Sequence, residues 1–400
     1  MPGPLHGYRV IDLTSMISGP FATMILADQG ADVIKIENPA AGGDYVRQAA
    51  NRRGGFSATF LNNNRNKRSV ALNLKDSRGV ELLLKLSMGA DVFVQNFRPG
   101  VVERLGIDAD AVRKVAPNLI YVSISGFGHT GPYANKPVYD PLIQAVSGLA
   151  TVQAGSDEKR PRLVRTILPD KLTAITASQA ITVALLARER TGEGQHVRLS
   201  MLDSVVSFLW GSDMGSQTFV GDELPQQAAA SFVDLVYDSA DGYLTVAVMS
   251  DKEWRGLTEA LEKPEWLDDD RFKTPALRDR NINDRITITQ EVLLNRPAAE
   301  WLQRLEQAGV PCAPVLTRNE MIQHPQVVAN GIVVANEHDQ AGTLRQTRNA
   351  AEFSNTAAVA RFGAPTLGGN TREVMSEIGL SADEVEHLLQ EKVLATGPEI

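Results

Sequence analysis

Short runs with strand character alternate with helical patterns along the first third of the chain, and this alternation constrains the fold more than any other feature. Helical patterns at residues 21–29 and 76–87 separate the first of these runs. Strands joined by helices form a parallel sheet, usually with right-handed crossovers. The sequence therefore predicts an α/β fold whose expected strands are 8–13, 32–37, 69–74, 91–97 and 119–124.

Polar or glycine-containing loops follow four of these expected strands, at residues 14–18, 38–39, 96–100 and 125–131. In parallel sheets, ligands bind outside the carboxyl ends of the strands. Taken alone, each loop is better explained as a simple turn, but four such loops at one edge of the sheet leave both interpretations open. The first turn lacks the Gly-x-Gly-x-x-Gly pattern, which counts against a nicotinamide dinucleotide as the ligand.

Composition excludes several classes of protein. The 400 residues include 40 Lys and Arg against 48 Asp and Glu, a formal net charge of −8. Nucleic-acid binding depends on basic residues that neutralise phosphates, so we expect no nucleic-acid partner. The single cysteine, Cys312, excludes an intramolecular disulfide and suits a reducing cytoplasm. No run resembles a signal peptide or a membrane span, and the six histidines show no metal-ligand spacing.

Charge is nevertheless uneven, because residues 47–78 contain eight basic residues and a single acid, Asp76. Such a run usually forms a solvated basic face. In an acidic chain it is also a candidate site for a small polyanion such as a nucleotide or coenzyme A. Both interpretations remain open from the sequence.

Asp170 precedes a long uncharged run, residues 172–187, that is expected to form a buried helix. Aspartate is among the best N-cap residues, and spacing alone favours that structural role. The positive end of a helix also keeps a carboxylate ionised, and an ionised, water-shielded carboxylate can act as an acyl-accepting nucleophile. Asp170 is therefore a candidate for both roles.

The middle of the chain has a different pattern. Residues 234–237 and 243–248 flank the turn 239–242, which predicts a β-hairpin. Three helices are then expected, at 252–261, 279–294 and 298–308. A later strand at 332–335 and a final helix, opened by a capping box at Ser381, resume the α/β pattern.

Short motifs are spread over nearly the whole chain: 30–37 (GADVIKIE), 64–69 (NRNKRS), 96–100 (NFRPG), 125–128 (SGFG), 139–140 (YD), 192–195 (GEGQ), 241–243 (DGY), 309–311 (GVP) and 365–368 (PTLG). Together they resemble the family III CoA-transferases, the CaiB–BaiF family. The resemblance implies a Rossmann-like large domain with a parallel sheet, a smaller α+β domain, and an interlocked homodimer. It places the first part of the large CoA-binding domain at 1–205, a linker and the small domain at 206–329, and the return to the large domain at 330–400.

The resemblance also implies site residues. The catalytic aspartate of the family corresponds to Asp170, which at this position favours the nucleophile over the cap. Lys75 and Arg104 would meet phosphates, and Phe97 would line the adenine pocket or else end its strand as a core aromatic. The full set of implied CoA contacts is Lys75, Asn96, Phe97, Arg98, Arg104 and Lys136.

The implied chemistry is covalent. Asp170 attacks an acyl-CoA thioester to give a mixed anhydride, the thiolate converts this to an aspartyl-CoA thioester, and an acceptor carboxylate takes over the CoA. Backbone N–H groups near Gly126 or Gly128 are candidates for stabilising the oxyanions. The substrates would be an acyl-CoA and a carboxylic acid, with no metal and no tightly bound cofactor.

Departures from the pattern narrow the choice of function. The formyl-CoA/oxalate branch has a glycine-rich loop where this chain has residues 220–233, and a polar residue where it has Ile17. Both differences count against oxalate. The racemase branch has a histidine where this chain has Tyr139. A CoA-transferase is therefore the favoured function. Tyr139 counts against an acyl-CoA racemase or isomerase, and the retained Asp170 counts against a non-catalytic CoA-binding protein.

Overall fold

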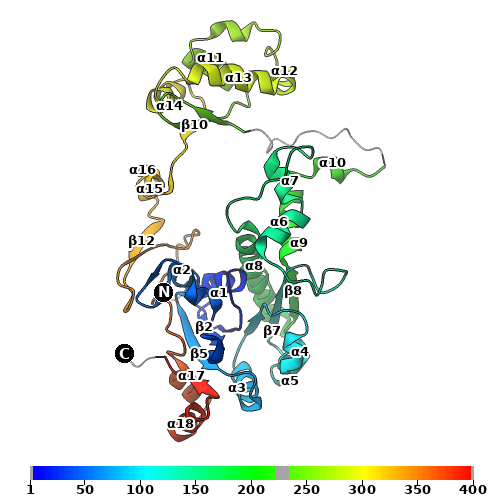
Figure 1. The fold of residues 1–400 in the computed structure, drawn as a ribbon, viewed down its shortest axis with the longest axis vertical. Helices are drawn as coiled ribbons and strands as arrows, with labels where there is room; N and C mark the ends of the chain where they lie inside the picture. The colour runs from blue at the N-terminus through cyan, green and yellow to red at the C-terminus, as the bar shows by residue number, and fades with distance from the viewer. Residues whose placement is uncertain (1–2, 222–233, 398–400) are drawn as a thin grey trace. The chain divides into compact units, whose positions relative to one another are not determined.

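The computed structural model describes residues 3–221 and 234–397 (Figure 1). The chain forms two compact units. The large unit comprises Met1–Ala229 together with Gly331–Ile400, and the small unit comprises Ala230–Asn330. The large unit is therefore built from both ends of the chain. The domain boundaries expected after residues 205 and 329 remain predictions.

A seven-stranded sheet organises the large unit. Its strand order is β14-β5-β2-β1-β6-β7-β8, and every neighbouring pair is parallel except β14 with β5. The strands are β1 (Arg9–Asp12), β2 (Asp32–Glu37), β5 (Lys67–Leu72), β6 (Val92–Gln95), β7 (Ile120–Ser125), β8 (His196–Ser200) and β14 (Leu394–Ala395). The predicted α/β fold with a parallel sheet is confirmed.

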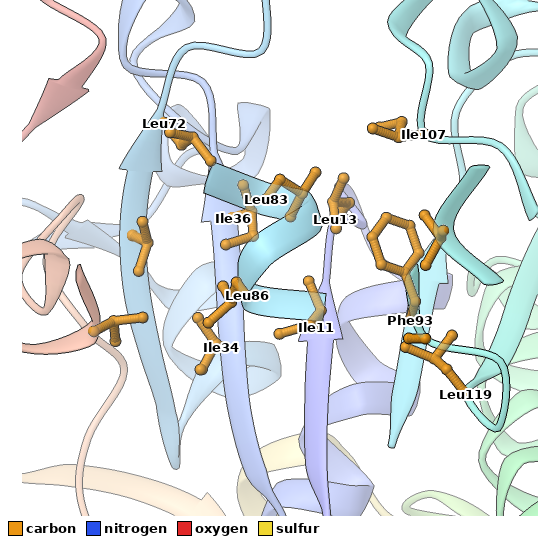
Figure 2. Close-up of a cluster of buried hydrophobic side chains, with 14 of the residues drawn as sticks. Ile11, Leu13, Ile34, Ile36, Leu72, Leu83, Leu86, Phe93, Ile107 and Leu119 are labelled. Atoms are coloured by element: carbon orange, nitrogen blue, oxygen red, sulfur yellow. The ribbon is translucent and has the colours of Figure 1, made fainter. Parts of the chain in front are cut away.

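Both faces of this sheet are covered by helices, which explains why its strands are apolar on both sides. On one face, Ile11, Ile34 and Phe93 pack against Leu83 and Leu86 of α3 (Ser77–Ser87), as Figure 2 shows. The helices α5 (Ala109–Val115), α17 (Thr371–Glu377) and α18 (Ala382–Gln390) contribute to the same cluster. The alternate strand residues face α1 (Ser18–Asp28) and α8 (Leu168–Thr191).

Further short elements complete the large unit. They are β3 (Arg52–Arg53), β4 (Phe56–Ser57), α2 (Ala58–Asn64), α4 (Val101–Leu105), α6 (Asp140–Val146), α7 (Leu149–Ala154), α9 (Met201–Trp210), α10 (Gly215–Thr218), β12 (Val333–Asn336) and β13 (Leu344–Thr347), with 3-10 turns at Pro39–Ala41 and Tyr45–Gln48. The capping box predicted at Ser381 is confirmed at the start of α18.

The helix α8 runs from Leu168 to Thr191 and ends at Gly192, whose φ of 75° is in the left-handed region that favours glycine. The expectation of a buried helix holds for only one face of α8. One face packs on the sheet, whereas Ile175, Val183 and Leu186 on the other face are about half exposed. None of the helices in the described residues is long and apolar enough to cross a membrane.

The small unit has a three-stranded antiparallel sheet, β11-β10-β9, formed by β9 (Val236–Asp238), β10 (Tyr243–Val246) and β11 (Cys312–Pro314). The predicted hairpin between β9 and β10 is confirmed. The remaining elements are α11 (Asp251–Ala260), a 3-10 turn at Pro264–Leu267, α12 (Pro275–Arg280), α13 (Ile282–Leu293), α14 (Ala298–Gln307), α15 (Arg318–Met321) and α16 (Pro325–Ala329).

The single helix expected at 279–294 is wrong, because the structure has two helices here. Thr274 caps the backbone N–H of Leu277, so α12 begins earlier than expected. Asn281 then leaves the helical conformation, and its side-chain amide donates to the carbonyls of Arg271 and Leu277. Asparagine side chains compete with backbone hydrogen bonds in this way, which separates α12 from α13.

Candidate active site

A cavity of about 830 Å³ opens at the carboxyl edge of the sheet in the large unit. The loops after β1, β6 and β7 line it, together with the start of α8. The chain leaves β1 toward β2 on one side of the sheet, and it leaves β6 toward β7 on the other side. The two connections therefore diverge between β1 and β6. This is the position at which parallel sheets form a ligand crevice. The loop after β2, at residues 38–39, contributes no lining residue.

The structure brings most of the implied site residues together. Those that line the cavity are Asn96, Phe97, Arg98, Arg104, Lys136 and Asp170. Lys75 is not among the lining residues. It is exposed after β5, which is separated from β1 by β2 and therefore lies on the far side of the crevice. Its assignment to CoA remains a prediction.

Asn96 connects two of the cavity loops. Its Nδ2 donates to the carbonyl oxygen of Ser15 at 2.9 Å, and its Oδ1 accepts from the Ser15 N–H at 3.0 Å. The neighbouring Phe97 is partly buried against the sheet core and also lines the cavity. Its role in an adenine pocket remains a prediction. The Phe97 N–H donates to Gln95 Oε1 at 2.9 Å, which fixes the turn at the end of β6.

Arg98, Arg104 and Lys136 are the cavity cations. All three are exposed, and none of them makes an ion pair within the part of the chain that the structure describes. The Lys136 Nζ lies 3.9 Å from the centre of the Tyr133 ring, a cation–π contact. Three uncompensated positive charges in one cavity favour a polyanionic ligand.

Part of the basic run 47–78 is buried, unlike the cavity cations. Arg47, Arg65 and Lys67 are the buried cations, and both interpretations of the run, a solvated face or a phosphate site, are wrong for them. Their acid partners lie before residue 47, so a charge count within the run could not reveal them. The pairs are Arg47 with Glu37 at 2.7 Å, Arg65 with Asp28 at 2.5 Å and Lys67 with Asp12 at 2.9 Å.

Asp170 is the third residue of α8, so the predicted N-cap role is wrong. The helix begins earlier because Pro169 is favourable in a first turn, and the N-cap residue Ile167 makes no side-chain cap. The backbone N–H of Asp170 instead donates to Oδ2 of Asp140, the first residue of α6, at 3.3 Å. A carboxylate from another helix therefore caps α8 and leaves the Asp170 side chain free for other contacts.

The Asp170 carboxyl group lies in the cavity wall and is half-buried. Burial, together with the neighbouring Asp140, raises its pKa to about 6. The backbone N–H and the hydroxyl of Ser18, which lines the same cavity, lower the pKa of Asp170 and counteract part of that rise. Asp170 is therefore mostly ionised at pH 7 while it is partly shielded from water.

Asp140 is almost fully buried, and burial raises its pKa. Gln144, one turn later on α6, donates from Nε2 to Asp140 Oδ1 at 2.6 Å. The same glutamine accepts from the Val164 N–H at 2.8 Å, which ties α6 to the segment before α8. Sequence reasoning quoted Asp140 only as part of a motif and missed Ser18 and Gln144. The spacing of Asp140 and Gln144, four residues apart on a helix, was an available signal.

Comparisons with known proteins agree on one family. CoA-transferase family III matches residues 5–371 of the chain. The chain is 33% identical to a succinyl-CoA:glutarate CoA-transferase of Mus musculus, over 96% of this chain and 89% of that protein. It is 36% identical to an acetyl-CoA:oxalate CoA-transferase of Acetobacter aceti, over 83% of this chain and 86% of that protein.

A solved structure has the same fold. The crystal structure of a CAIB/BAIF family protein from Brucella suis superposes with a TM-score of 0.81 at 28% identity, covering 94% of this chain and 100% of that one. The resemblance drawn from the sequence motifs is thereby confirmed. The protein belongs to CoA-transferase family III and is an enzyme of that family.

Proposed function

We propose that this enzyme moves CoA from an acyl-CoA thioester to a carboxylic acid through a covalent intermediate on Asp170. One observation carries the proposal: a half-buried carboxylate, ionised at neutral pH, lies in the wall of the cavity that holds the unpaired cations. A partly desolvated carboxylate is an effective acyl-accepting nucleophile.

The proposed reaction exchanges acyl groups in four nucleophilic attacks. First, an Asp170 oxygen attacks the thioester carbonyl carbon, the C–S bond breaks, and CoA leaves as a thiolate. The thiolate then attacks the Asp170 carbonyl carbon of the mixed anhydride and expels the acyl group as a carboxylate. The acceptor carboxylate then attacks the same carbon, the C–S bond breaks, and a second mixed anhydride forms with release of the thiolate. Finally the thiolate attacks the acceptor's acyl carbon in this anhydride, forms the new thioester and expels Asp170 as a carboxylate. Each step is an acyl transfer of similar difficulty, which is the advantage of a covalent nucleophile.

We place the CoA moiety along the β6 end of the cavity. The cavity cations Arg98, Arg104 and Lys136 are positioned to meet phosphates, and the exposed part of Phe97 offers a surface for the adenine ring. Support for Lys75 comes from the family resemblance alone.

The acceptor in this proposal is a small carboxylic acid. Related enzymes are named for glutarate and oxalate, which makes dicarboxylic acids the first acceptors to test. Ile17 lines the same cavity as Asp170, and it still counts against oxalate as the acceptor. The other part of that argument, residues 220–233, lies outside the described residues apart from Val220 and Gly221.

We further propose that the enzyme is an obligate, interlocked homodimer. The outer face of α8 exposes Ile175, Val183 and Leu186, and α9, which packs on α8, exposes Phe208 and Trp210. Exposed apolar side chains on two helices that pack together favour a protein interface. A folded monomer that persists on dilution to nanomolar concentration, followed by analytical ultracentrifugation, contradicts this proposal.

The nucleophile is tested by Asp170→Asn, which keeps the shape of the side chain and removes its charge. We expect a folded protein that still binds CoA but has lost turnover. Wild-type protein incubated with succinyl-CoA and no acceptor should carry CoA on the peptide containing Asp170, as measured by mass spectrometry. Substantial turnover by Asp170→Asn, in protein checked for deamidation back to aspartate, contradicts the mechanism.

A further inference from the structure

We propose that Gln95 is a positioning residue for CoA binding. Its buried side chain holds the turn at residues 96–98, which lines the cavity, through a chain of hydrogen bonds that begins on β8. Gln95 itself does not line the cavity, so it acts through the backbone of Phe97. This inference rests on the proposed function, which places CoA at the β6 end of the cavity.

The hydrogen-bond chain crosses three neighbouring strands. Gln95 ends β6 with a polar side chain, whereas the preceding residues 92–94 are apolar. It is 5% exposed, and Ser123, its partner on β7, is 4% exposed. Gln95 Nε2 donates to Ser123 Oγ at 3.0 Å, and this Oγ lies 2.8 Å from Nε2 of His196 on β8. Buried polar groups cost free energy unless they are hydrogen-bonded, so this chain needs a complete set of partners.

The partners fix the direction of each bond in the chain. Gln95 Oε1 accepts from the Phe97 N–H at 2.9 Å, which leaves Nε2 as the donor to Ser123. The Ser123 hydroxyl can then donate its hydrogen to His196 Nε2. Burial and the nearby Arg198 lower the pKa of His196 to about 4, so its ring is neutral at pH 7 and Nε2 can accept. The Gln95 oxygen is thereby kept on the Phe97 N–H.

A row of aromatic rings supports the chain on the same face of the sheet. Phe93 of β6 stacks on Tyr121 of β7, and Tyr121 meets the edge of the His196 ring, with ring centres 5.0 Å apart in both pairs. Figure 2 shows Phe93 in the core beside these strands. Residues two apart on a strand share a face, so Gln95 follows Phe93 directly on that face. The packed rings restrict the His196 ring and with it the acceptor for Ser123.

The turn that Gln95 holds leads to two of the three cavity cations. Arg98 follows Phe97, and its carbonyl oxygen accepts from the Val101 N–H at 3.2 Å, where α4 begins. Arg104 lies on α4. The path of the backbone as it leaves β6 therefore positions both arginines. A site that is ordered before the ligand arrives avoids the free-energy cost of ordering it on binding.

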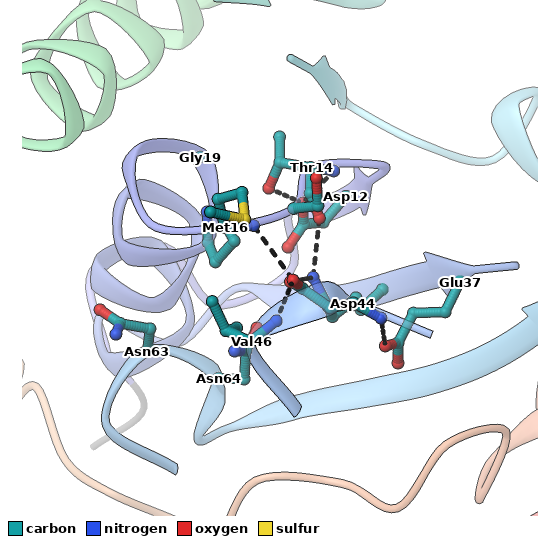
Figure 3. A network of polar contacts seen from close by, with 12 residues as sticks. Asp12, Thr14, Met16, Gly19, Glu37, Asp44, Val46, Asn63 and Asn64 are labelled. Carbon is teal, nitrogen blue, oxygen red and sulfur yellow. Dashed lines mark hydrogen bonds and ion pairs between the residues drawn. The ribbon is translucent and has the colours of Figure 1, made fainter. Parts of the chain in front are cut away.

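The same turn is held from the side of β1. Asn96 bonds to both the N–H and the carbonyl oxygen of Ser15. The loop that contains Ser15 is itself fixed, because the Met16 N–H donates to Asp44 Oδ1 at 3.0 Å, as Figure 3 shows. Gln95 is thus the link between β6, β7 and β8, and Asn96 is the link to the loop after β1.

The test compares Gln95→Met with a matched control. Gln95→Met nearly keeps the length of the side chain and removes both of its hydrogen bonds. Gln346→Met removes a buried amide from β13, outside the cavity lining, where Nε2 donates to the Leu61 carbonyl at 3.0 Å. Titration calorimetry measures CoA affinity at a temperature at which both variants are folded. Mass spectrometry measures the maximal rate at which saturating succinyl-CoA, without acceptor, attaches CoA to Asp170.

The expected result is a loss of affinity with little change in the chemical step. One hydrogen bond is worth up to about tenfold in an equilibrium constant, so we expect CoA affinity to fall about tenfold in Gln95→Met. The maximal rate of adduct formation should change by less than about twofold, because uniform binding contributes to affinity and not to the reaction rate. Gln346→Met should match the wild type in both measurements, even where its free energy of unfolding falls.

A second pair of variants tests the chain one residue farther from the cavity. Ser123→Thr keeps the hydroxyl, and Ser123→Val has almost the same shape as Ser123→Thr without it. Both replacements are β-branched and suit a strand. Without the hydroxyl, Gln95 Nε2 loses its partner, so CoA affinity should be about two- to threefold lower in Ser123→Val than in Ser123→Thr.

The outcomes separate this inference from the proposed function. Wild-type protein that binds no CoA overturns both. Wild-type protein that binds CoA but forms no adduct with succinyl-, acetyl- or formyl-CoA overturns the covalent mechanism alone, and the affinities still decide the role of Gln95. Folded Gln95→Met with wild-type affinity overturns that role, and so does an equal loss of affinity in Gln346→Met. Where Gln95→Met does not fold, equal affinities of Ser123→Val and Ser123→Thr overturn it.

Discussion

The large unit contains two groups of basic side chains in opposite environments. The buried cations Arg47, Arg65 and Lys67 each face an acid from a neighbouring element. The cavity cations Arg98, Arg104 and Lys136 are exposed and face open space at the carboxyl edge of the sheet. A charge that is compensated inside the fold stabilises the fold, whereas a charge left uncompensated in a cavity is available to a ligand.

Lys67 should give the largest effect. Burial lowers its pKa to about 8, so it is still mostly charged at pH 7, and with Lys35 it holds the pKa of buried Asp12 well below the usual range. Lys67→Met leaves Asp12 buried without this partner, which typically costs about 3–5 kcal/mol. We expect a loss of this size in the free energy of unfolding, measured by chemical denaturation.

The control is the double variant Asp12→Asn with Lys67→Met, which removes both charges. It should recover part of the loss, because no uncompensated charge stays buried. A single variant as stable as the wild type would show that the pair is dispensable, and would remove the distinction between buried and cavity cations.

The cavity cations should affect binding and leave stability nearly unchanged. Losing a hydrogen bond to a charged group costs about 1.5–3 kcal/mol, so Arg98→Ala and Arg104→Ala should each weaken CoA binding about tenfold or more. Calorimetry at low and high salt measures this, and the loss should be larger at low salt. Arg190→Ala, an exposed arginine near the end of α8, is the matched control. Unchanged CoA affinity in the variant that combines Arg98→Ala with Arg104→Ala would show that these two arginines do not bind the phosphates.

Asp140→Asn tests whether Asp140 controls the ionisation of Asp170. Asparagine can still accept the Asp170 N–H, but it no longer raises the Asp170 pKa by charge repulsion. In the proposed mechanism Asp170 reacts as a carboxylate, so activity should be lost as the pH falls through its pKa of about 6. A lower pKa therefore extends activity to lower pH, and the acidic limb of the rate profile should shift downward. A limb that stays in place or moves upward shows that Asp140 does not control this ionisation.

Lys75→Ala should give the smallest effect, because Lys75 is exposed outside the cavity lining. We expect CoA affinity to fall by less than about twofold, within the range of surface substitutions. Calorimetry under the conditions used for Arg104→Ala provides the comparison. A loss as large as that of Arg104→Ala would show that bound CoA reaches across the sheet edge, as the family resemblance implies.

Much of the fold was predictable because its signals are local. The expected strand at 32–37 matches β2, and the start of α3 follows Asp76, whose side chain accepts from the Arg78 N–H as an N-cap. The strand expected at 69–74 lies two residues too late, since β5 begins at Lys67. A charged residue is an unlikely choice for a buried strand position, and only its pairing with Asp12 makes that position stable.

The site was predictable in outline only. The sequence by itself determined the alternation of strands and helices, and hence a crevice at the carboxyl edge of a parallel sheet, because these follow from short-range periodicity and general chirality. It also carried the motifs that identify the family. Only the tertiary structure decided that Asp140 rather than Asp170 caps α8, that Ser18 and Asp170 line the same cavity, and which cations are compensated. Those facts depend on contacts between residues far apart in the chain, and such contacts leave no periodic trace in the sequence.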